Sequence, residues 1–391
     1  MVHNKFSKFY LKTPDERLKI ISKNLNNNNL IHFYRPNKNF DNKYVDELSE
    51  NVFSYFPLPL SVIPNFIVNN HSYIVPIVTE EKGVVAGASI GAKLCSSTGG
   101  FKVKHDSPIM TGQIFLRPNK IISKKIIKEI IKNKKNYLNK LNNISKTILK
   151  DGKKIDDMGI NKIKTKKGIR ILVELDIFVN NSAGANTTMQ VCEICSPFFE
   201  ELLNSKALLK LQKNLALKRL VKSKAIWAKE ELENNIYGIS AKKLIENILE
   251  LQEFAKVNIE RACTHNKGIM NGIDGVAVAT GNDWRILESG IHAFAIRKGK
   301  YSPLTNYKLD KNKNLVGEIE LPLVIGIVGG SIDNNPFAQK SLNILGVKSA
   351  LELADILASV GLAQNFAALR QMALSGMLAG DIKLEKTKYK H

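Results

Sequence analysis

Residues 169–190 read IRILVELDIFVNNSAGANTTMQ, and the order of patterns within this stretch decides the fold. Apolar and polar side chains alternate over 169–179, with the period of two that is typical of a β-strand buried on one face. Gly184 then permits a tight turn, because glycine adopts left-handed backbone angles without steric cost. A helical pattern begins after Asn186, so the stretch predicts a strand, a turn and a helix in succession.

The segments on either side extend this unit. Residues 113–116, QIFL, are predicted as a strand, and residues 121–141 place isoleucine and leucine at helical spacing with lysine on the opposite, solvated face. Residues 215–228, LALKRLVKSKAIWA, are predicted as a closing strand. The order strand, helix, strand, helix, strand indicates a small split βαβ, ferredoxin-like unit at 113–228.

The chain before and after this unit also mixes helices and strands. Its patterns predict β-structure at 58–78 broken by Pro64 and by a turn at 69–70, a closely packed helix at 82–97, a helix at 240–262, short strands at 275–281 and 321–331, and a helical pair at 349–379 broken near Gly361. The predicted fold class is α+β, a large mixed helix and sheet domain with the small unit inserted in it. The predicted divisions are 1–112, 113–228, 229–375 and a polar tail at 376–391.

Composition limits the class of protein. The 391 residues carry a formal net charge of +22 and only four cysteines. Lysine is abundant throughout, together with asparagine and isoleucine, and no aromatic residues alternate with the lysines in the way that base stacking requires, so specific nucleic-acid binding is not expected. The sequence has no apolar run of about 18 residues and no secretory signal core, so we expect no membrane span and a reducing, cytoplasmic location.

Cys192 and Cys195 form a C-x-x-C pattern, which is compatible with a redox pair or with half of a zinc site. They also lie at helical spacing with apolar neighbours. No second pair of cysteines or histidines in the sequence completes tetrahedral coordination. We therefore expect both thiols in a packed core and no bound metal.

The turn at 181–186, NSAGAN, is the first candidate binding site. A glycine turn before a helix exposes backbone N–H groups at the positive end of the helix dipole, which is a ready site for a pyrophosphate. A simple connection between a strand and a helix explains the same pattern, so the turn alone does not decide between the two.

Charged residues at two places in the chain are candidates for acid–base chemistry. Glu80 and Glu81 end an apolar strand, where adjacent side chains point to opposite faces, so only one of them can face a pocket. An apolar pocket would raise the pKa of that carboxyl and make it a proton donor near neutrality, whereas a solvated turn would not. Lys267 precedes Gly268, and Asp283 follows a predicted strand, so this lysine and aspartate could form an ion pair, either structural or catalytic.

These residues lie in segments that resemble the hydroxymethylglutaryl-coenzyme A (HMG-CoA) reductase family, in particular its soluble bacterial class (class II). The similarity runs in order from about residue 45 to residue 380. The matching segments are ENV, LPL, NFIVN, VPIVTEEKGVVAGAS, AKLCSSTGGF, SAGANTTM, RACTHNKGIMNGID, ATGNDWR, LPLVIGIVGG, ILGVKSA and GLAQN.

The resemblance implies reduction of HMG-CoA to mevalonate and CoA by two successive hydride transfers from NADH or NADPH, with NADH favoured because the soluble class often uses it. It implies a homodimer or larger homo-oligomer with active sites between subunits, and it makes the inserted domain the dinucleotide-binding domain. The catalytic positions are Glu81, Lys267 and Asp283. The substrate positions are Arg261, Asn271 and Gly83. The cofactor positions are Asn181, Ala183, Gly184, Ala185, Asn186 and Asn214.

Four departures from the family pattern bear on activity. The family has a histidine in a Gly-His-Met segment that protonates the departing CoA thiolate, and Asp381 stands there in this chain. An aspartate with an ordinary pKa of about 4 is ionised at pH 7 and is a poor acid for a thiolate. Residues 376–391 correspond only to a remnant of the family's C-terminal flap, Asn181 replaces an aspartate, and Gly83 replaces a serine. The alternative is therefore a degenerate member that binds CoA ligands or NAD(P) with little turnover.

Overall fold

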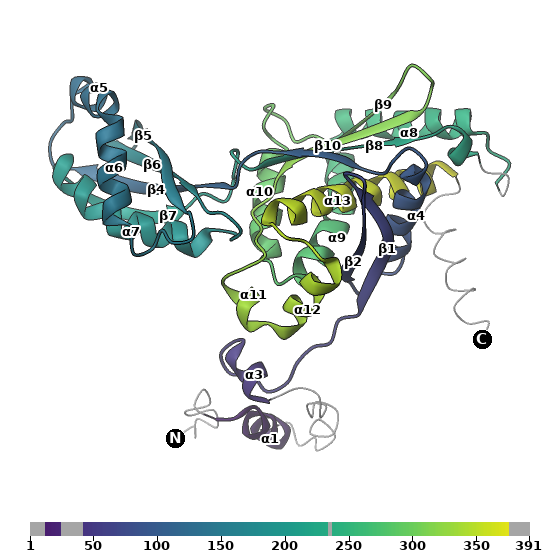
Figure 1. Cartoon of the computed structure of the whole chain (residues 1–391), viewed down its shortest axis with the longest axis horizontal. Helices are drawn as coiled ribbons and strands as arrows, with labels where there is room; N and C mark the ends of the chain where they lie inside the picture. The colour runs from purple at the N-terminus through teal and green to yellow at the C-terminus, as the bar shows by residue number, and fades with distance from the viewer. Residues whose placement is uncertain (1–11, 25–41, 234–236, 375–391) are drawn as a thin grey trace. The chain divides into compact units, whose positions relative to one another are not determined.

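Figure 1 shows the computed structural model of the chain, which describes residues 12–24, 42–233 and 237–374. Clustering of the backbone separates two compact units, Met1–Pro59 and Leu60–His391. The first unit contains the helices α1 (Pro14–Asn24) and α3 (Asn42–Glu47). All of the candidate site residues within the described ranges belong to the second unit.

The second unit begins with an antiparallel hairpin of β1 (Leu60–Val68) and β2 (His71–Val78). Its turn consists of Asn69 and Asn70, whose φ angles of 48° and 71° lie in the left-handed region that asparagine tolerates better than most residues. The pairing register shifts at Pro64, since proline cannot donate a backbone hydrogen bond to the neighbouring strand. The predicted strands, turn and break are therefore confirmed.

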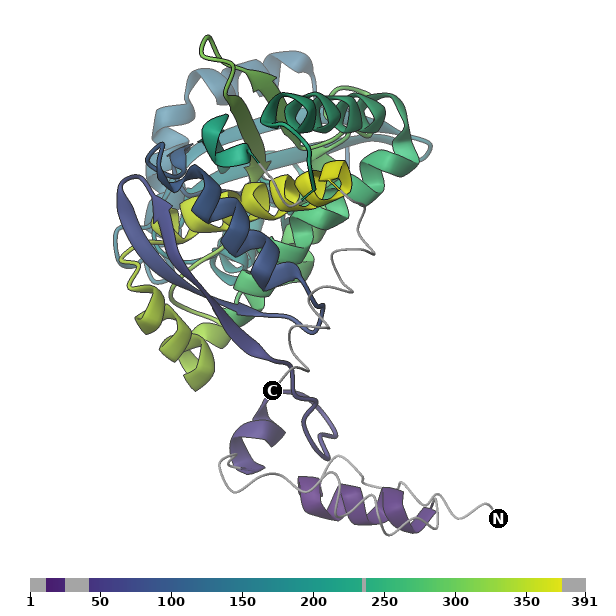
Figure 2. The same cartoon turned by 90° about the vertical axis from the view of Figure 1, so that its right-hand side faces the viewer.

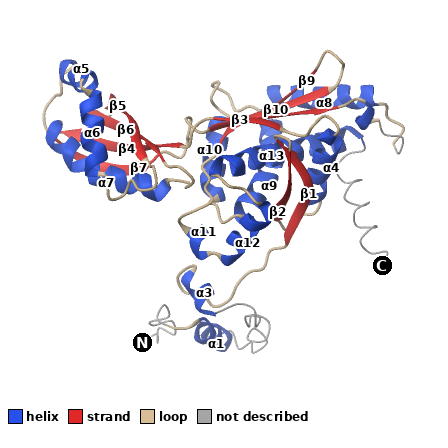
Figure 3. Ribbon diagram, viewed as in Figure 1, coloured by secondary structure: helices blue, strands red, loops and turns tan. Residues whose placement is uncertain are grey.

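An antiparallel sheet in the order β3-β8-β10-β9 forms one side of the large core (Figure 3). Its strands are β3 (Lys102–His105), β8 (Leu220–Trp227), β9 (Thr305–Leu309) and β10 (Leu315–Pro322). The helices packed with it are α4 (Val84–Ser96), α8 (Ala241–Val257), α9 (Ile259–Ala279), α10 (Trp284–Phe294) and α13 (Ala350–Leu374), and the short helices α11 (Ser331–Asn334) and α12 (Pro336–Leu345) follow β10. The helix predicted at 82–97 is confirmed as α4.

Helix α13 runs through the middle of this core, and Figure 2 shows it in yellow alongside α4 in dark blue. The predicted break at Gly361 is wrong. A side chain at Gly361 would lie 2.9–3.0 Å from Ile269 and Ile273, so this glycine allows α9 to approach α13 closely and does not end the helix. Among the described helices, none combines the length and the hydrophobicity needed to cross a membrane.

The strand predicted at 275–281 is also wrong, because these residues form the last turns of α9 and its C-terminal cap. Gly275 packs directly on the hairpin, where an added Cβ would lie 2.5 Å from Ile77. The C-terminal half of α9 is buried on nearly all sides, so its apolar run has no solvated face to reveal the helical period. The strand predicted at 321–331 is confirmed only for its first two residues, which end β10.

A second antiparallel sheet has the order β5-β6-β4-β7. Its strands are β4 (Ile109–Pro118), β5 (Lys154–Thr165), β6 (Gly168–Phe178) and β7 (Ser205–Gln212), and its helices are α5 (Lys124–Lys132), α6 (Lys134–Ile144) and α7 (Ala185–Leu202). The strand, turn and helix predicted over 169–190 are confirmed as β6 and α7. The sequence reading missed β5 and β7.

The predicted closing strand at 215–228 belongs to the other sheet, because β8 pairs with β3 and β10. Alternation reveals that a strand is buried on one face, but not which strand it pairs with. The second sheet has its own hydrophobic cluster, in which Cys192 and Cys195 are buried and burial raises the pKa of Cys192 to about 12. The two thiols therefore pack in the core as expected. The domain division at 113 and 228 stays a prediction.

Candidate active site

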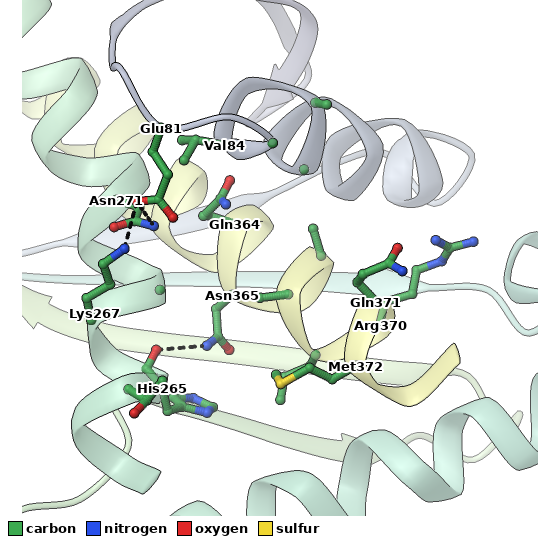
Figure 4. Close-up of a pocket in the computed structure, with 18 of the residues that line it drawn as sticks. Glu81, Val84, His265, Lys267, Asn271, Gln364, Asn365, Arg370, Gln371 and Met372 are labelled. Carbon is green, nitrogen blue, oxygen red and sulfur yellow. Dashed lines mark hydrogen bonds and ion pairs between the residues drawn. The ribbon is translucent and has the colours of Figure 1, made fainter. Parts of the chain in front are cut away.

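A cavity of about 280 Å³ lies where α4, α9, α13 and the loop before α4 meet (Figure 4). The loop contributes Glu81 and Gly83 to the lining. The residues that α9 contributes include Arg261, Lys267, Gly268 and Asn271. All of the predicted substrate positions thus line one pocket, together with two of the three predicted catalytic residues.

Glu81 is held by two donors from α9. The Lys267 ammonium donates to Glu81 Oε2 at 2.7 Å, and the Asn271 amide donates to the same oxygen at 3.2 Å. Lys267 and Asn271 are four residues apart and therefore lie on the same face of the helix, pointing toward the carboxylate in Figure 4. The Glu81 backbone N–H donates to Thr79 Oγ1 at 3.1 Å, which fixes the loop that presents the side chain.

The ion pair is open to solvent within a single chain. The Lys267 side chain is 60% exposed and the Glu81 side chain 49% exposed. The apolar burial expected around the glutamate is therefore not supplied by the described residues of one chain. Lys267 and Gly268 lie inside α9. An added Cβ at Gly268 would meet no atom within 4 Å, which leaves the helix backbone accessible from the pocket.

Gly83 lines the cavity without a side chain of its own. Its φ of 86° places it in the left-handed region, where it caps the N-terminus of α4. Glycine adopts this conformation without the steric penalty of a Cβ. The residue that replaces the family's serine therefore shapes the loop but offers no hydroxyl to a ligand.

Asp283 lies apart from this pocket. Lys267 is twelve residues before Ala279, the last residue of α9, which corresponds to about 18 Å along the helix. Asp283 is the N-cap of α10, where its carboxylate accepts from the Arg285 backbone N–H at 3.0 Å and pairs with Arg285 Nε at 3.3 Å. The expected Lys267–Asp283 ion pair is not formed within one chain.

The sequence reading missed the residues that α13 brings to the pocket, above all Gln364 and Asn365. Thr305 Oγ1 donates to Asn365 Oδ1 at 2.9 Å, so this hydroxyl must accept from His265 Nε2, which lies 2.6 Å away. Burial lowers the pKa of His265 to about 3, and the ring is therefore neutral. The signal was present in the sequence as two adjacent amides within the largely apolar stretch 356–369.

Arg261 also faces the cavity, one turn before His265. Its guanidinium lies 3.6 Å from Met372 Sδ on α13, and desolvation lowers the pKa of Arg261 from its usual value. The guanidinium contacts no carboxylate among the described residues that would neutralise it. Four cationic side chains among the described residues line the pocket, Lys82, Arg261, Lys267 and Arg370, which suits a ligand that carries negative charge.

The predicted dinucleotide loop has the geometry of an anion site. Gly184 has a φ of 89° and begins α7, whose N-terminus has no side-chain cap. A Cβ at Gly184 would lie 2.7 Å from Val179, so both conformation and space require glycine. Uncapped backbone N–H groups at a helix N-terminus suit a pyrophosphate, so the loop fits the phosphate part of a nicotinamide dinucleotide. Ala185 and Asn186 are the first residues of this helix.

Asn181 and Asn214 are engaged in contacts within the chain. Asn181 Oδ1 accepts from the Ala350 backbone N–H at 3.1 Å, at the start of α13, and the Asn181 carbonyl accepts from Ile327 N–H at 2.9 Å. Asn214 Oδ1 accepts from Gln212 Nε2 at 3.4 Å. Asparagine and aspartate accept equally well at helix N-termini, so the replacement of the family's aspartate at 181 preserves this link. Asp381 lies outside the described residues.

A second charged cluster lies behind the pocket, where α9 meets α10. Asp274 and Glu288 share a hydrogen bond between their carboxyl groups, and burial, followed by the charge of Glu288, raises the pKa of Asp274 to about 8. Glu288 also pairs with His292 at 2.7 Å, and His292 Nδ1 lies 2.7 Å from the Tyr301 hydroxyl. Hydrogen bonds from His292 and Asp274 lower the pKa of Glu288, so the proton resides on Asp274.

We expect the free energy of unfolding to fall as the pH rises from about 4 to about 8, by about 1–2 kcal/mol after allowance for partial exposure. The folded chain holds the Asp274 proton over this range, while the unfolded chain releases it near pH 4. Asp274→Asn keeps a donor to Glu288 without the titration. Urea unfolding at pH 5 and pH 8 should therefore show a smaller pH dependence for this variant, and an unchanged dependence would contradict the assignment.

Comparisons with known proteins were made on sequence and on structure. The family model for hydroxymethylglutaryl-coenzyme A reductase matches residues 13–386. The chain is 38% identical over 340 residues to the 3-hydroxy-3-methylglutaryl-coenzyme A reductase of Archaeoglobus fulgidus, covering 87% of this chain and 76% of the relative. It is 32% identical over 366 residues to a probable reductase of Borreliella burgdorferi, covering 92% and 80%.

Solved structures agree with these matches. The reductase of Streptococcus pneumoniae superposes with a TM-score of 0.80 at 35% identity, covering 94% of this chain and 99% of that one. A structure of the class II reductase from the same organism bound to NADPH, in open conformations, gives a TM-score of 0.80 at 36% identity, with the same coverage. With its fold and almost its whole sequence matched, the chain belongs to the hydroxymethylglutaryl-coenzyme A reductase family.

Proposed function

We propose that the chain is an NAD(P)H-dependent HMG-CoA reductase that forms mevalonate and CoA by two successive hydride transfers. The observation that carries this proposal is the 2.7 Å contact between Lys267 and Glu81 in the cavity. An ammonium group beside a carboxyl group is the pair of functions that reduction of a carbonyl requires, one to stabilise the developing alkoxide and one to supply its proton. The cationic and amide side chains around the same cavity, among them Arg261, Lys267 and Asn271, suit the carboxylate and the carbonyl groups of HMG-CoA.

The residues divide the chemistry as follows. The bound dinucleotide supplies hydride, once to the thioester carbonyl carbon and once to the aldehyde that remains after CoA departs. Lys267 holds the carbonyl oxygen in both steps and stabilises the negative charge that forms on it. Glu81, in its protonated form, delivers the proton to the alcohol oxygen of the second step. Arg261 and Asn271 orient the substrate, with the carboxylate end directed toward the guanidinium.

Two chains are proposed to complete the site. Asp283 is half-exposed and follows the C-terminal end of α9, which lies about 18 Å along the helix from Lys267. A homodimer with sites between subunits would allow Asp283 of a second copy to approach the Glu81–Lys267 pair. A carboxylate there would stabilise the positive charge of Lys267.

Aspartate at position 381 should slow the first reduction, of the thioester, but not the second reduction, of the aldehyde. The departing CoA thiolate must be protonated in the first reduction, whereas mevaldehyde reduction involves no thiolate. We expect the wild-type chain to oxidise NADH or NADPH faster with mevaldehyde than with HMG-CoA. Asp381→His should raise the rate with HMG-CoA by roughly 10- to 100-fold and leave the rate with mevaldehyde within twofold.

Absorbance at 340 nm with each substrate and each dinucleotide measures all four rates, and it also decides between NADH, which we favour, and NADPH. The mevaldehyde rate is the internal control for the folding of the variant. If neither substrate consumes cofactor while the chain still binds CoA or dinucleotide, the degenerate alternative is correct. Equal rates with both substrates in the wild type would contradict the role assigned to position 381.

A further inference from the structure

Arg219 is a buried cation at the junction between the two sheets. The residue is only 4% exposed and lies directly before β8. Its Nη1 donates to the Ala183 carbonyl at 2.8 Å, and its Nη2 donates to the Ile325 carbonyl at 2.9 Å. Ala183 belongs to the predicted dinucleotide loop, and Ile325 follows β10 in the large core. One guanidinium therefore joins these two segments through their backbones.

The same two segments are in van der Waals contact beside the arginine. A Cβ at Gly326 would lie 2.4 Å from the Ala183 backbone nitrogen, so only glycine lets the chains approach this closely. The Ile327 N–H donates to the Asn181 carbonyl at 2.9 Å, and a β-bridge links Ser182 to Val328. The predicted dinucleotide loop therefore lies against the 325–328 segment, and backbone contacts join the two.

The 325–328 segment is in turn fixed to the turn that carries Asp283. The buried Asn282 side chain accepts from Gly326 N–H at 2.8 Å and donates to the Gly326 carbonyl at 3.1 Å. These two bonds imitate a backbone pairing and leave little freedom to either segment. A continuous set of contacts thus runs from the loop through Gly326 to the residue next to Asp283.

The charge of Arg219 is not neutralised in the described part of the chain. Its hydrogen-bond acceptors there are two carbonyl oxygens, and no described carboxylate forms an ion pair with it. Burial lowers the pKa of Arg219 to about 10, which still leaves it protonated at neutral pH. An unpaired buried charge is costly for folding, so stability alone does not account for a cation in this position. An anion bound at the loop would offset that cost.

We propose that Arg219 is a positioning residue for the dinucleotide site: it fixes the loop at 181–186 against the turn of Asp283 and adds positive potential beneath the bound phosphates. This proposal rests on the proposed reductase function, because it takes the loop to be the dinucleotide site. As a consequence, Arg219 would fix the position of the cofactor relative to the Asp283 turn without contacting either of them.

The test compares Arg219→Met, Arg219→Lys and Gly326→Ala with the wild-type chain. Loss of the two charge-assisted bonds should raise the KM for NADH or NADPH by roughly 10- to 100-fold in Arg219→Met, with the KM for HMG-CoA within about twofold. Arg219→Lys keeps the charge and should fall between this variant and the wild type. Gly326→Ala displaces the loop without changing any charge and should raise the same KM. Lys210→Met, on the exposed face of β7, removes one positive charge elsewhere in the second sheet and should change neither KM.

Hydrogen exchange of the dinucleotide-free chain provides a readout that does not depend on the reaction. Arg219→Met and Gly326→Ala should accelerate exchange in peptides covering 181–188 and 323–328 by at least about tenfold, while peptides from β5 and β6 keep wild-type rates. If Arg219→Met does not fold, Arg219→Lys and Gly326→Ala decide the question.

The possible outcomes separate the two proposals. Faster exchange in a chain whose wild type turns over no substrate would uphold the anchoring by Arg219 and refute the reductase function. Unchanged exchange together with an unchanged cofactor KM would overturn the proposal for Arg219. A parallel rise in both KM values, or a fall in kcat alone, would show a general structural role and would also overturn it.

Discussion

Replacing Lys267 by methionine is expected to lower kcat/KM for HMG-CoA by about 10²- to 10³-fold, because the developing alkoxide loses the ammonium group that lies 2.7 Å from Glu81. Methionine keeps most of the length of the side chain, and the position is 60% exposed, so the fold should be retained. The loss should appear in kcat with both HMG-CoA and mevaldehyde, since the ammonium acts on the carbonyl oxygen in both reductions. Initial rates at saturating cofactor measure it.

Lys256 offers a matched control. It pairs with Glu253 at 2.7 Å, the same length as the Lys267–Glu81 pair, on the exposed surface of α8 away from the pocket. Lys256→Met should change kcat/KM by less than about twofold, as expected for the loss of a surface ion pair. A Lys267→Met chain with wild-type rates would refute the catalytic assignment and leave the Glu81 contact as an ordinary surface pair.

The same variant tests whether the sites lie between subunits. Lys267→Met and Asp283→Asn chains, each inactive alone, are co-expressed and purified as a mixture. If Lys267 and Asp283 act from different subunits of a dimer, half of the molecules are mixed and each has one intact site, which restores up to about a quarter of the wild-type rate. No restored activity would indicate that both residues act within one chain.

Trp227→Ala is expected to lower the free energy of unfolding by about 3–5 kcal/mol. The indole is fully buried, with its ring stacked 3.9 Å from Phe366 on α13 and its Nε1 donating to the Gly91 carbonyl on α4 at 3.0 Å. The substitution therefore leaves a cavity and removes the side-chain hydrogen bond to the Gly91 carbonyl, at the point where β8 meets the two helices that line the pocket. Urea unfolding followed by circular dichroism gives the change.

The second tryptophan of the chain is the control. Trp284 is 41% exposed at the start of α10, with the Arg285 guanidinium 5.4 Å from its ring. Trp284→Ala should cost less than about 1 kcal/mol, since it removes an exposed contact and creates no cavity. Trp227→Phe keeps the stacking and loses the hydrogen bond, so it should lie between the two alanine variants. Equal effects of the two alanine substitutions would contradict the role given to the Trp227 contacts.

Local patterns in the sequence predict the helices and strands that have one buried face and one more exposed face. Apolar and polar side chains alternate along β6 because one side of the strand faces α7 and the core and the other side is more open. The hairpin of β1 and β2 is predicted by Asn69 and Asn70 at its turn. The C-terminal half of α9 and the whole of α13 lack such a contrast. Both are enclosed by other elements, so an apolar run in α9 resembles a strand and Gly361 resembles a break.

The pocket could be predicted only in part, because some of its residues are neighbours on one helix and others are brought together only by tertiary contacts. Lys267 and Asn271 follow from helical spacing once α9 is recognised as a helix, and Glu81 is joined to them by the tertiary contact of the loop with α9. Gln364 and Asn365 arrive from a helix almost a hundred residues further along, and no local pattern connects them to Lys267. Asp283 follows the C-terminal end of α9, so its position depends on the length of this helix. The sequence patterns instead predict a helix that ends at residue 262 and a separate strand at 275–281.

If the loop at 181–186 binds the dinucleotide as proposed, the bond from Asn181 to the start of α13 restricts how the coenzyme preference can be engineered. Libraries that randomise the loop at 181–186 will also randomise the acceptor for the Ala350 N–H, at a cost of about 1 kcal/mol whenever an apolar residue is drawn at position 181. The lost hydrogen bond would destabilise the N-terminus of α13, the helix that also contains Gln364 and Asn365. Variants selected for a new coenzyme should therefore retain asparagine, aspartate, serine or threonine at position 181, and a screen confined to Ala183 and Ala185 would spare the substrate pocket.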